Sequence, residues 1–128
     1  MKAIDTNIVV RFLTGEEHPQ TGIARKLVAE QDVFVPVTVL LESAWVLKSV
    51  YGFDRKTVVA ALQAFGGLAS VTLESSSSVA EALNRAAAGM DIADALHLGA
   101  ASECKSFLTF DRRFIRSADG SPVQVHEP

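Results

Sequence analysis

The chain has 128 residues, the length of one average domain, and 48% of them are hydrophobic against 21% charged. That composition excludes a disordered chain and is enough to bury a core without disulfide staples. The formal net charge of −3 is opposite in sign to the basic surface that usually accompanies nucleic-acid binding. Bound divalent cations would reverse that sign locally.

Cysteine use and hydropathy limit the compartment. Cys104 is the single cysteine, so an intramolecular disulfide and a thiolate zinc site are both excluded. Asp5 interrupts the N-terminal apolar run, and no run approaches the ~18 residues that a membrane-spanning helix needs. We therefore expect a protein of the reducing cytoplasm, without an export signal or a membrane span.

Short runs rich in β-branched residues alternate with longer stretches of helical period. In chain order the patterns predict a strand at 2–4, helices at 6–13 and 20–30, a strand at 33–35, helices at 37–51 and 55–65, a strand at 71–73, helices at 79–88 and 92–103, and strands at 107–108 and 123–125. Strands separated by helices favour parallel pairing with helices on both faces. The predicted fold is α/β, a three-layer α/β/α sandwich with a short parallel sheet, in a single domain over residues 1–128.

Two aspartates directly follow predicted strands. Ligands of open α/β sheets bind beyond the carboxyl ends of the strands, where Asp5 and Asp111 are expected. Capping is the commoner use of a single aspartate at such a place: Asp5 or Thr6 for the following helix, and Asp111 for a turn at 111–114. Neither aspartate alone establishes a site.

Glu42 lies in a predicted helix that is apolar nearly all round, so we expect that helix to be covered on most sides. Its helical neighbours, Thr38, Val39, Trp45 and Val46, include no base that would pair with it. A distant base or a metal ion then has to compensate its charge. The alternative is a solvated Glu42 at the edge of the helix.

A further pair of acids opens the helix predicted at 92–103. Asp91 is a natural N-cap, and Asp94 lies one turn further on the same face, near the positive end of the helix dipole. Capping explains Asp91 well. Small and apolar residues surround Asp94 and imply close packing, so Asp94 is the stronger candidate for a ligand.

Four carboxylates at one end of a sheet cannot all stay ionised without raised pKa values or bound cations. Oxygen ligands without a cysteine or histidine cluster suit Mg²⁺ or Mn²⁺, which retain waters that a phosphate oxygen displaces. Such ions activate water and neutralise charge on the phosphoryl group. The acids therefore favour a metal-dependent phosphodiesterase.

The ordered motifs Asp5-Thr6-Asn7, Glu42, Asp91-Ile92-Ala93-Asp94-Ala95 and Thr109-Phe110-Asp111 together resemble the PIN-domain family, most closely its VapC-type toxins of prokaryotic toxin–antitoxin pairs. The resemblance implies a parallel-sheet α/β/α sandwich, Mg²⁺- or Mn²⁺-dependent cleavage of RNA, homodimerisation, and inhibition by a cognate antitoxin protein. It assigns catalytic and metal-binding roles to Asp5, Glu42, Asp94 and Asp111, an auxiliary metal-binding role to Asp91, and supporting hydroxyls to Thr6 and Thr109.

Three arginines follow the last of these motifs, namely Arg112, Arg113 and Arg116. They either pair with Asp111 structurally or contact RNA phosphates. His97 is expected to have a packing or surface role, because metal-activated water does not require an imidazole.

Aromatic and apolar residues are frequent between residues 37 and 65. We expect Trp45 and Phe53 to belong to the core or to an interface rather than to stack on bases. Part of this region is our candidate for the dimer and antitoxin interface.

Two other classes of protein gather acids in a similar way. A receiver domain needs paired acids after the first strand, an acceptor aspartate after the third and a lysine after the fifth, and Asp5 and Glu74 do not fit that pattern. A haloacid-dehalogenase-type phosphatase needs a second aspartate close to Asp5, which is missing here. A PIN-like fold that only binds RNA or protein, without catalysis, stays open.

Overall fold

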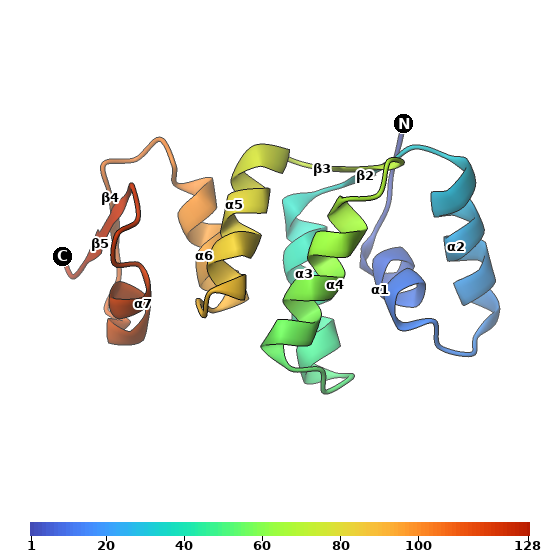
Figure 1. Cartoon of the computed structure of the whole chain (residues 1–128), viewed down its shortest axis with the longest axis horizontal. Helices are drawn as coiled ribbons and strands as arrows, with labels where there is room; N and C mark the ends of the chain where they lie inside the picture. Colours follow the sequence, from blue (N-terminus) through green and yellow to red (C-terminus); the bar gives the residue numbers. More distant parts are fainter. The chain divides into compact units, whose positions relative to one another are not determined.

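The computed structural model describes all residues, 1–128, as seven helices and five short strands (Figure 1). In chain order these are β1 (Lys2–Ala3), α1 (Thr6–Thr14), α2 (Pro19–Glu30), β2 (Val33–Val35), α3 (Val37–Ser49), α4 (Arg55–Gly66), β3 (Val71–Leu73), α5 (Ser76–Ala87), α6 (Ile92–Ala100), β4 (Ser106–Leu108), α7 (Arg112–Ser117) and β5 (Gln124–His126). Contacts within the chain divide it into two compact units, Met1–Ser76 and Ser77–Pro128.

The N-terminal unit is built on a parallel sheet of three strands. Strand β2 lies in the middle, with Val33 opposite Lys2 of β1 and Val71 of β3. Val33 and Val35 are buried while Phe34 between them is half-buried, as expected for a strand with helices nearby. The predicted parallel pairing of these strands is therefore confirmed.

Four helices complete the core of this unit. Helix α1 packs against α2 and α3, and α3 packs against α4. Their apolar faces contribute fully buried side chains, of which Phe65, Leu40, Leu62 and Val9 are among the largest. Burial of such side chains stabilises a fold by roughly 1.5–3 kcal/mol each, which explains how strands of two or three residues are held in register.

The C-terminal unit contains the parallel pair β4 and β5, in which Ser106 is opposite Gln124. Helix α5 begins at Ser76, three residues before the predicted start, because the serines form its first turn rather than a loop before it. Gly99 of α6 lies against α5: a Cβ built there would come within 3.3 Å of the Ser78 carbonyl oxygen. A glycine at this position therefore permits the close approach of the two helices.

Helix α7 is the element that the sequence patterns did not predict. The expectation was a turn at 111–114, whereas the chain continues helical to Ser117. Its one buried side chain, Phe114, packs against Phe107 of β4 with ring centroids 5.2 Å apart. A six-residue helix with a single buried position has too little periodicity to be recognised from sequence.

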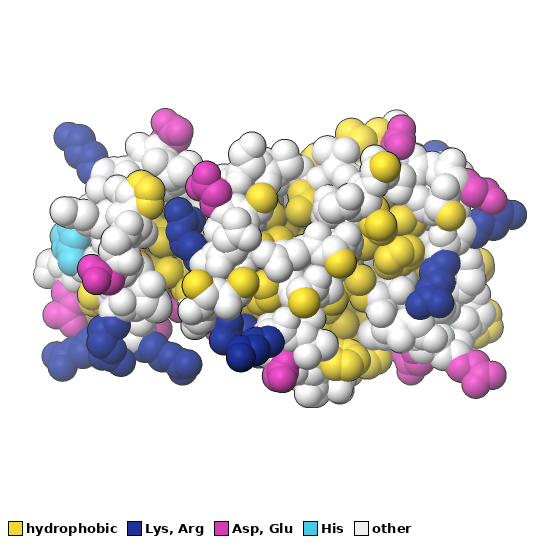
Figure 2. Space-filling view, viewed as in Figure 1, with side chains coloured by type: hydrophobic (Ala, Val, Ile, Leu, Met, Phe, Trp, Pro, Cys, Tyr) yellow, Lys and Arg dark blue, Asp and Glu magenta, His cyan; other side chains and the backbone are white.

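None of the helices has both the length and the apolar character needed to cross a membrane. The surface of the C-terminal unit is basic around α7, where Arg112, Arg113 and Arg116 are exposed. Figure 2 shows Lys and Arg side chains gathered at the end of the view that carries α7 in Figure 1.

Candidate active site

The first group of predicted site residues lies where α1 begins. Asp5 is extended, with φ −99° and ψ −179°, and its Oδ1 accepts a hydrogen bond from the Ile8 amide at 3.3 Å, so it is the N-cap of α1. Thr6, only 8% exposed, donates its hydroxyl hydrogen bond to Oε1 of Glu42 in α3. The structure thus brings Thr6 of α1 and Glu42 of α3 into contact, and Asp5 directly precedes Thr6 in the chain.

Glu42 is exposed, and the expectation that its helix is covered on most sides is wrong. Helix α3 buries one face, through Leu40, Ser43, Ala44 and Leu47, and leaves the other open. The pattern misled because apolar residues occupy both faces, although only one meets α1 and α4. The partner of Glu42 is a hydroxyl far away in sequence, which inspection of its helical neighbours does not reveal.

The two aromatic residues near this helix are not core residues. Trp45 is 63% exposed, and Phe53 is 41% exposed with its ring stacked on that of Tyr51. The expected core role is therefore wrong for both residues, and the interface role stays a prediction.

The second group lies in the C-terminal unit, at the start of α6. Asp91 is the N-cap of this helix, and its Oδ1 accepts from the Asp94 amide at 3.1 Å. Partial burial raises the pKa of Asp94, and the nearby negative charges of Asp91 and then Asp111 raise it further. His97 and Arg113 lower the same pKa by less. Asp94 is therefore close enough to both Asp91 and Asp111 to be repelled by their charges.

Asp111 caps α7. Its Oδ1 accepts from the amides of Arg113 at 2.9 Å and Phe114 at 3.2 Å, while its own amide donates to the Thr109 hydroxyl at 3.0 Å. The capping role weighed for Asp111 is thus present. It does not exclude a second role, because both bonds use Oδ1 and leave Oδ2 without a protein partner.

The arginines after Asp111 do not form ion pairs with it. Arg112 lies 3.7 Å from Glu127, and both side chains are largely exposed, so that contact is weak. Arg113 and Arg116 are exposed and make no salt bridge. Of the two roles considered, structural pairing with Asp111 is not observed.

The donor chemistry of these residues fits a hard divalent cation. All the candidates supply carboxylate or hydroxyl oxygens, and the mutual repulsion at Asp94 is relieved when a cation binds. Within neither unit do three or more acidic, histidine or cysteine side chains form a metal-holding group by themselves. Asp5 and Glu42 belong to the N-terminal unit, and Asp91, Asp94 and Asp111 to the C-terminal unit.

Comparison with known families decides the class of protein. The family model of the PIN domain matches residues 2–120, from β1 to beyond the end of α7. The chain belongs to the PIN domain family. Neither the search of curated proteins nor that of solved structures found a match.

Membership in the family confirms the predicted fold class, α/β with a short parallel sheet of the α/β/α sandwich type. PIN domains are generally nucleases that act on RNA or DNA and generally use divalent metal ions. The matched segment of this PIN domain includes every candidate acid, threonine and arginine named above.

One acid next to the N-terminal sheet has a structural role that the sequence did not predict. Glu74 directly follows β3, and its Oε1 accepts from the Val37 amide at 2.8 Å, at the first residue of α3. Pro36 precedes that helix and offers no side-chain cap, so Glu74 satisfies an amide that would otherwise lack a partner. The position of Glu74 directly after a strand was the only sequence signal. The amide that it accepts from lies on a different element, α3, so the sequence does not reveal the pair.

The Thr6 hydroxyl is expected to be a positioning group for Glu42. Thr6→Val keeps the shape of the side chain but removes the hydrogen bond, and we expect about a tenfold loss of nuclease kcat with little change in KM. Thr6→Ser retains the hydroxyl and is the matched control, expected to stay within about twofold of the wild type. Equal losses in both variants would point to packing rather than to orientation of Glu42.

Proposed function

We propose that this PIN domain is a metal-dependent endoribonuclease whose catalytic, metal-binding acids are Asp5, Glu42, Asp94 and Asp111, with Asp91 as auxiliary ligand. The observation that carries the proposal is the partly buried Asp94, whose pKa is raised by burial and by the nearby charges of Asp91 and Asp111, in a chain of the PIN domain family. Such an arrangement stores repulsion that a bound cation relieves, and perturbed carboxylates of this kind are typical of catalytic sites.

The proposed acids would hold Mg²⁺ or Mn²⁺, which when bound would supply an activated water and offset the charge of the phosphoryl oxygens. Thr6 holds Glu42 in one orientation through their hydrogen bond. The Thr109 hydroxyl accepts from the Asp111 amide, and the capping bonds of Asp111 use only Oδ1, so Oδ2 is left for a ligand. Arg112, Arg113 and Arg116 are exposed beside Asp111 and are suited to hold the RNA backbone through charge-assisted hydrogen bonds.

The choice of RNA, and the biological role, rest on the resemblance of the motifs to VapC-type toxins. We propose accordingly that the protein is the toxin of a toxin–antitoxin pair, works in the cytoplasm as a homodimer, and is inhibited by a small antitoxin protein. Exposed apolar side chains in the region between residues 37 and 65 support an interface there: Trp45, Val50 and Phe53 are 63%, 67% and 41% exposed.

One observation favours the second candidate, a PIN-like module that binds RNA without cleaving it. Asp5, Asp91 and Asp111 each cap a helix, so their presence has a structural explanation without any metal. Exposure to solvent and the Thr6 hydrogen bond account for Glu42, but capping does not explain the partly buried Asp94, which is why we favour the nuclease.

Removal of the metal separates the two candidates. Purified protein, stripped with EDTA and supplied with end-labelled RNA, is expected to cut only when Mn²⁺ or Mg²⁺ is restored, with a rate at least about 100-fold above the chelated sample. Matched samples with Ca²⁺ control for a merely structural effect of divalent ions. RNA that is retained in a binding assay yet intact with every metal would establish the silent module instead.

A further inference from the structure

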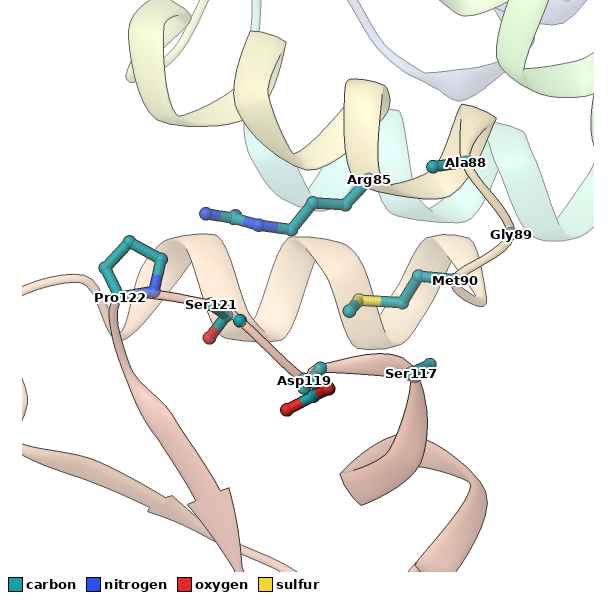
Figure 3. A pocket seen from close by; sticks show the side chains of 10 residues that line it. Arg85, Ala88, Gly89, Met90, Ser117, Asp119, Ser121 and Pro122 are labelled. Atoms are coloured by element: carbon teal, nitrogen blue, oxygen red, sulfur yellow. The ribbon is translucent and has the colours of Figure 1, made fainter.

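A cavity of about 550 Å³ lies in the C-terminal unit between the end of α5, the segment before α6 and the loop after α7 (Figure 3). Its volume is within the range of small-molecule sites, ~300–1,000 Å³. Gly89 and Gly120 border it, and a Cβ built on either would meet nothing within 4 Å. None of the proposed catalytic acids lines this cavity.

Two opposite charges line the cavity from different elements. The Arg85 guanidinium extends from α5, and Asp119 comes from the loop after α7 (Figure 3). Arg85 is only 23% exposed, yet its one ion pair, with Glu81, is 3.9 Å long and involves a largely exposed partner. Asp119 makes no ion pair, and its carboxylate accepts no hydrogen bond in the protein. Both groups are therefore available to a ligand.

Toward a ligand, the two serine side chains of the cavity can act only as hydrogen-bond acceptors, because their protons are already donated within the protein. The Ser117 hydroxyl donates to the Phe114 carbonyl oxygen at 2.9 Å, and the Ser121 hydroxyl donates to that of Val123. Each keeps lone pairs for a ligand donor but has no proton to give. Met90, 4% exposed, adds an apolar surface to the same cavity.

An arginine fork and a carboxylate in one cavity suit a neutral group with one acceptor edge and one donor edge. A simple anion would be repelled by Asp119, and a simple cation by Arg85. Among the RNA bases only guanine has two adjacent donors, N1–H and N2–H₂, which match the two oxygens of a carboxylate. Guanine also carries the O6 and N7 acceptors that an arginine fork binds bidentately.

We propose that this cavity binds a guanine base of the RNA substrate, with Asp119 accepting from N1–H and N2–H₂ and Arg85 donating to O6 and N7. The proposal rests on the proposed ribonuclease function and adds a specificity site to it. Met90 directly precedes Asp91, the N-cap of the helix that carries Asp94. A guanine held there places the neighbouring RNA backbone beside that acidic helix end, so cleavage occurs at a fixed distance from a guanine.

Binding of free nucleotides tests the site without any cleavage. In EDTA, titration calorimetry of the full chain is expected to show GMP binding at least about tenfold more tightly than AMP, CMP or UMP. Inosine monophosphate lacks the N2 amine and 7-deaza-GMP lacks N7, so each is expected to bind about tenfold more weakly than GMP. Equal affinities for all these nucleotides would overturn the proposal.

Two variants assign the contacts. Asp119→Asn replaces one acceptor oxygen with a donor amide. Its affinity for GMP should fall about tenfold, and its affinity for xanthosine monophosphate, whose O2 accepts where guanine donates, should rise. Arg85→Gln should bind GMP and 7-deaza-GMP with equal affinity, because the variant no longer donates to N7. Glu103→Gln, an exposed site in the same unit, controls for the loss of charge, and circular dichroism confirms that each variant is folded.

Cleavage of oligonucleotides with a single guanine at successive positions tests the RNA assignment. The cut should move with the guanine, and replacement by inosine should slow it about tenfold. Selective GMP binding by a protein that cuts no RNA would uphold the guanine site and refute the nuclease. Guanine-independent cleavage would leave the nuclease intact and overturn this inference, with selective GMP binding then marking a site for a free nucleotide.

Discussion

Asp5→Asn is expected to reduce Mn²⁺-dependent RNA cleavage by about 100-fold or more while leaving the chain folded. Asparagine is as good an N-cap as aspartate, so its amide oxygen still accepts from the Ile8 amide and α1 still begins at Thr6. What the substitution removes is a full negative charge that a hard cation requires. Single-turnover cleavage of labelled RNA measures the loss, and far-ultraviolet circular dichroism measures the fold.

The chain offers a matched control for that experiment. Asp54 caps α4 in the same way that Asp5 caps α1, with its side chain accepting from the Thr57 amide at 2.8 Å. Hydrogen bonds from Thr57 lower the pKa of Asp54, as expected for a carboxylate that caps a helix. Asp54→Asn should retain full cleavage, and a comparable loss in both variants would show that capping, not catalysis, explains the Asp5 effect.

Asp94→Asn is expected to abolish cleavage and at the same time to stabilise the metal-free protein. The wild-type carboxylate is partly buried and repelled by Asp91 and Asp111, which raises its pKa in the folded state above that in the unfolded state. Like-charge repulsion between neighbours three or four residues apart at a helix, as for Asp91 and Asp94, costs about 0.2–0.5 kcal/mol per pair. Urea unfolding in EDTA measures the free energy, and activity assays with Mn²⁺ measure the loss.

The stability difference should depend on pH in a definite direction. Because the folded pKa of Asp94 is the raised one, the folded state binds the proton more tightly, and wild-type stability falls as pH rises from the unfolded toward the folded pKa. The difference in free energy of unfolding between Asp94→Asn and the wild type should therefore be largest above that pH range and vanish below it. Asp91→Asn retains the cap of α6 and should show a smaller gain; a variant at position 94 less stable than wild type at neutral pH would contradict this account.

Much of the local structure was predictable because it depends on neighbours in sequence. The strand at Val33–Val35 and that at Val71–Leu73 were predicted to the residue, and α1, α2 and α4 to within one residue at each end. Capping by Asp91 was equally predictable, since an aspartate before an apolar helix commonly accepts a hydrogen bond from the amide three residues ahead. Helix α7 was missed because a single buried phenylalanine gives no period.

The candidate site shows the opposite limit. Sequence order and residue type predicted which acids are candidates for the site. They did not predict that Glu42 is exposed or that its hydrogen-bond partner is Thr6. Hydrogen bonds between residues 36 positions apart depend on how α1 and α3 pack, and no local pattern encodes that. The cavity between Arg85 and Asp119 was likewise invisible, since its two charges lie on different elements.

The sequence by itself determined the α/β alternation, the parallel strands and membership in the PIN domain family, because hydrophobic period and motif order are properties of the chain. Only the tertiary structure decided which side of α3 is exposed to solvent, that Asp91 and Asp111 repel the charge of Asp94, and that Arg85 and Asp119 line one cavity. The physical reason is that burial and charge interaction depend on distance in space, which folding sets through contacts remote in sequence.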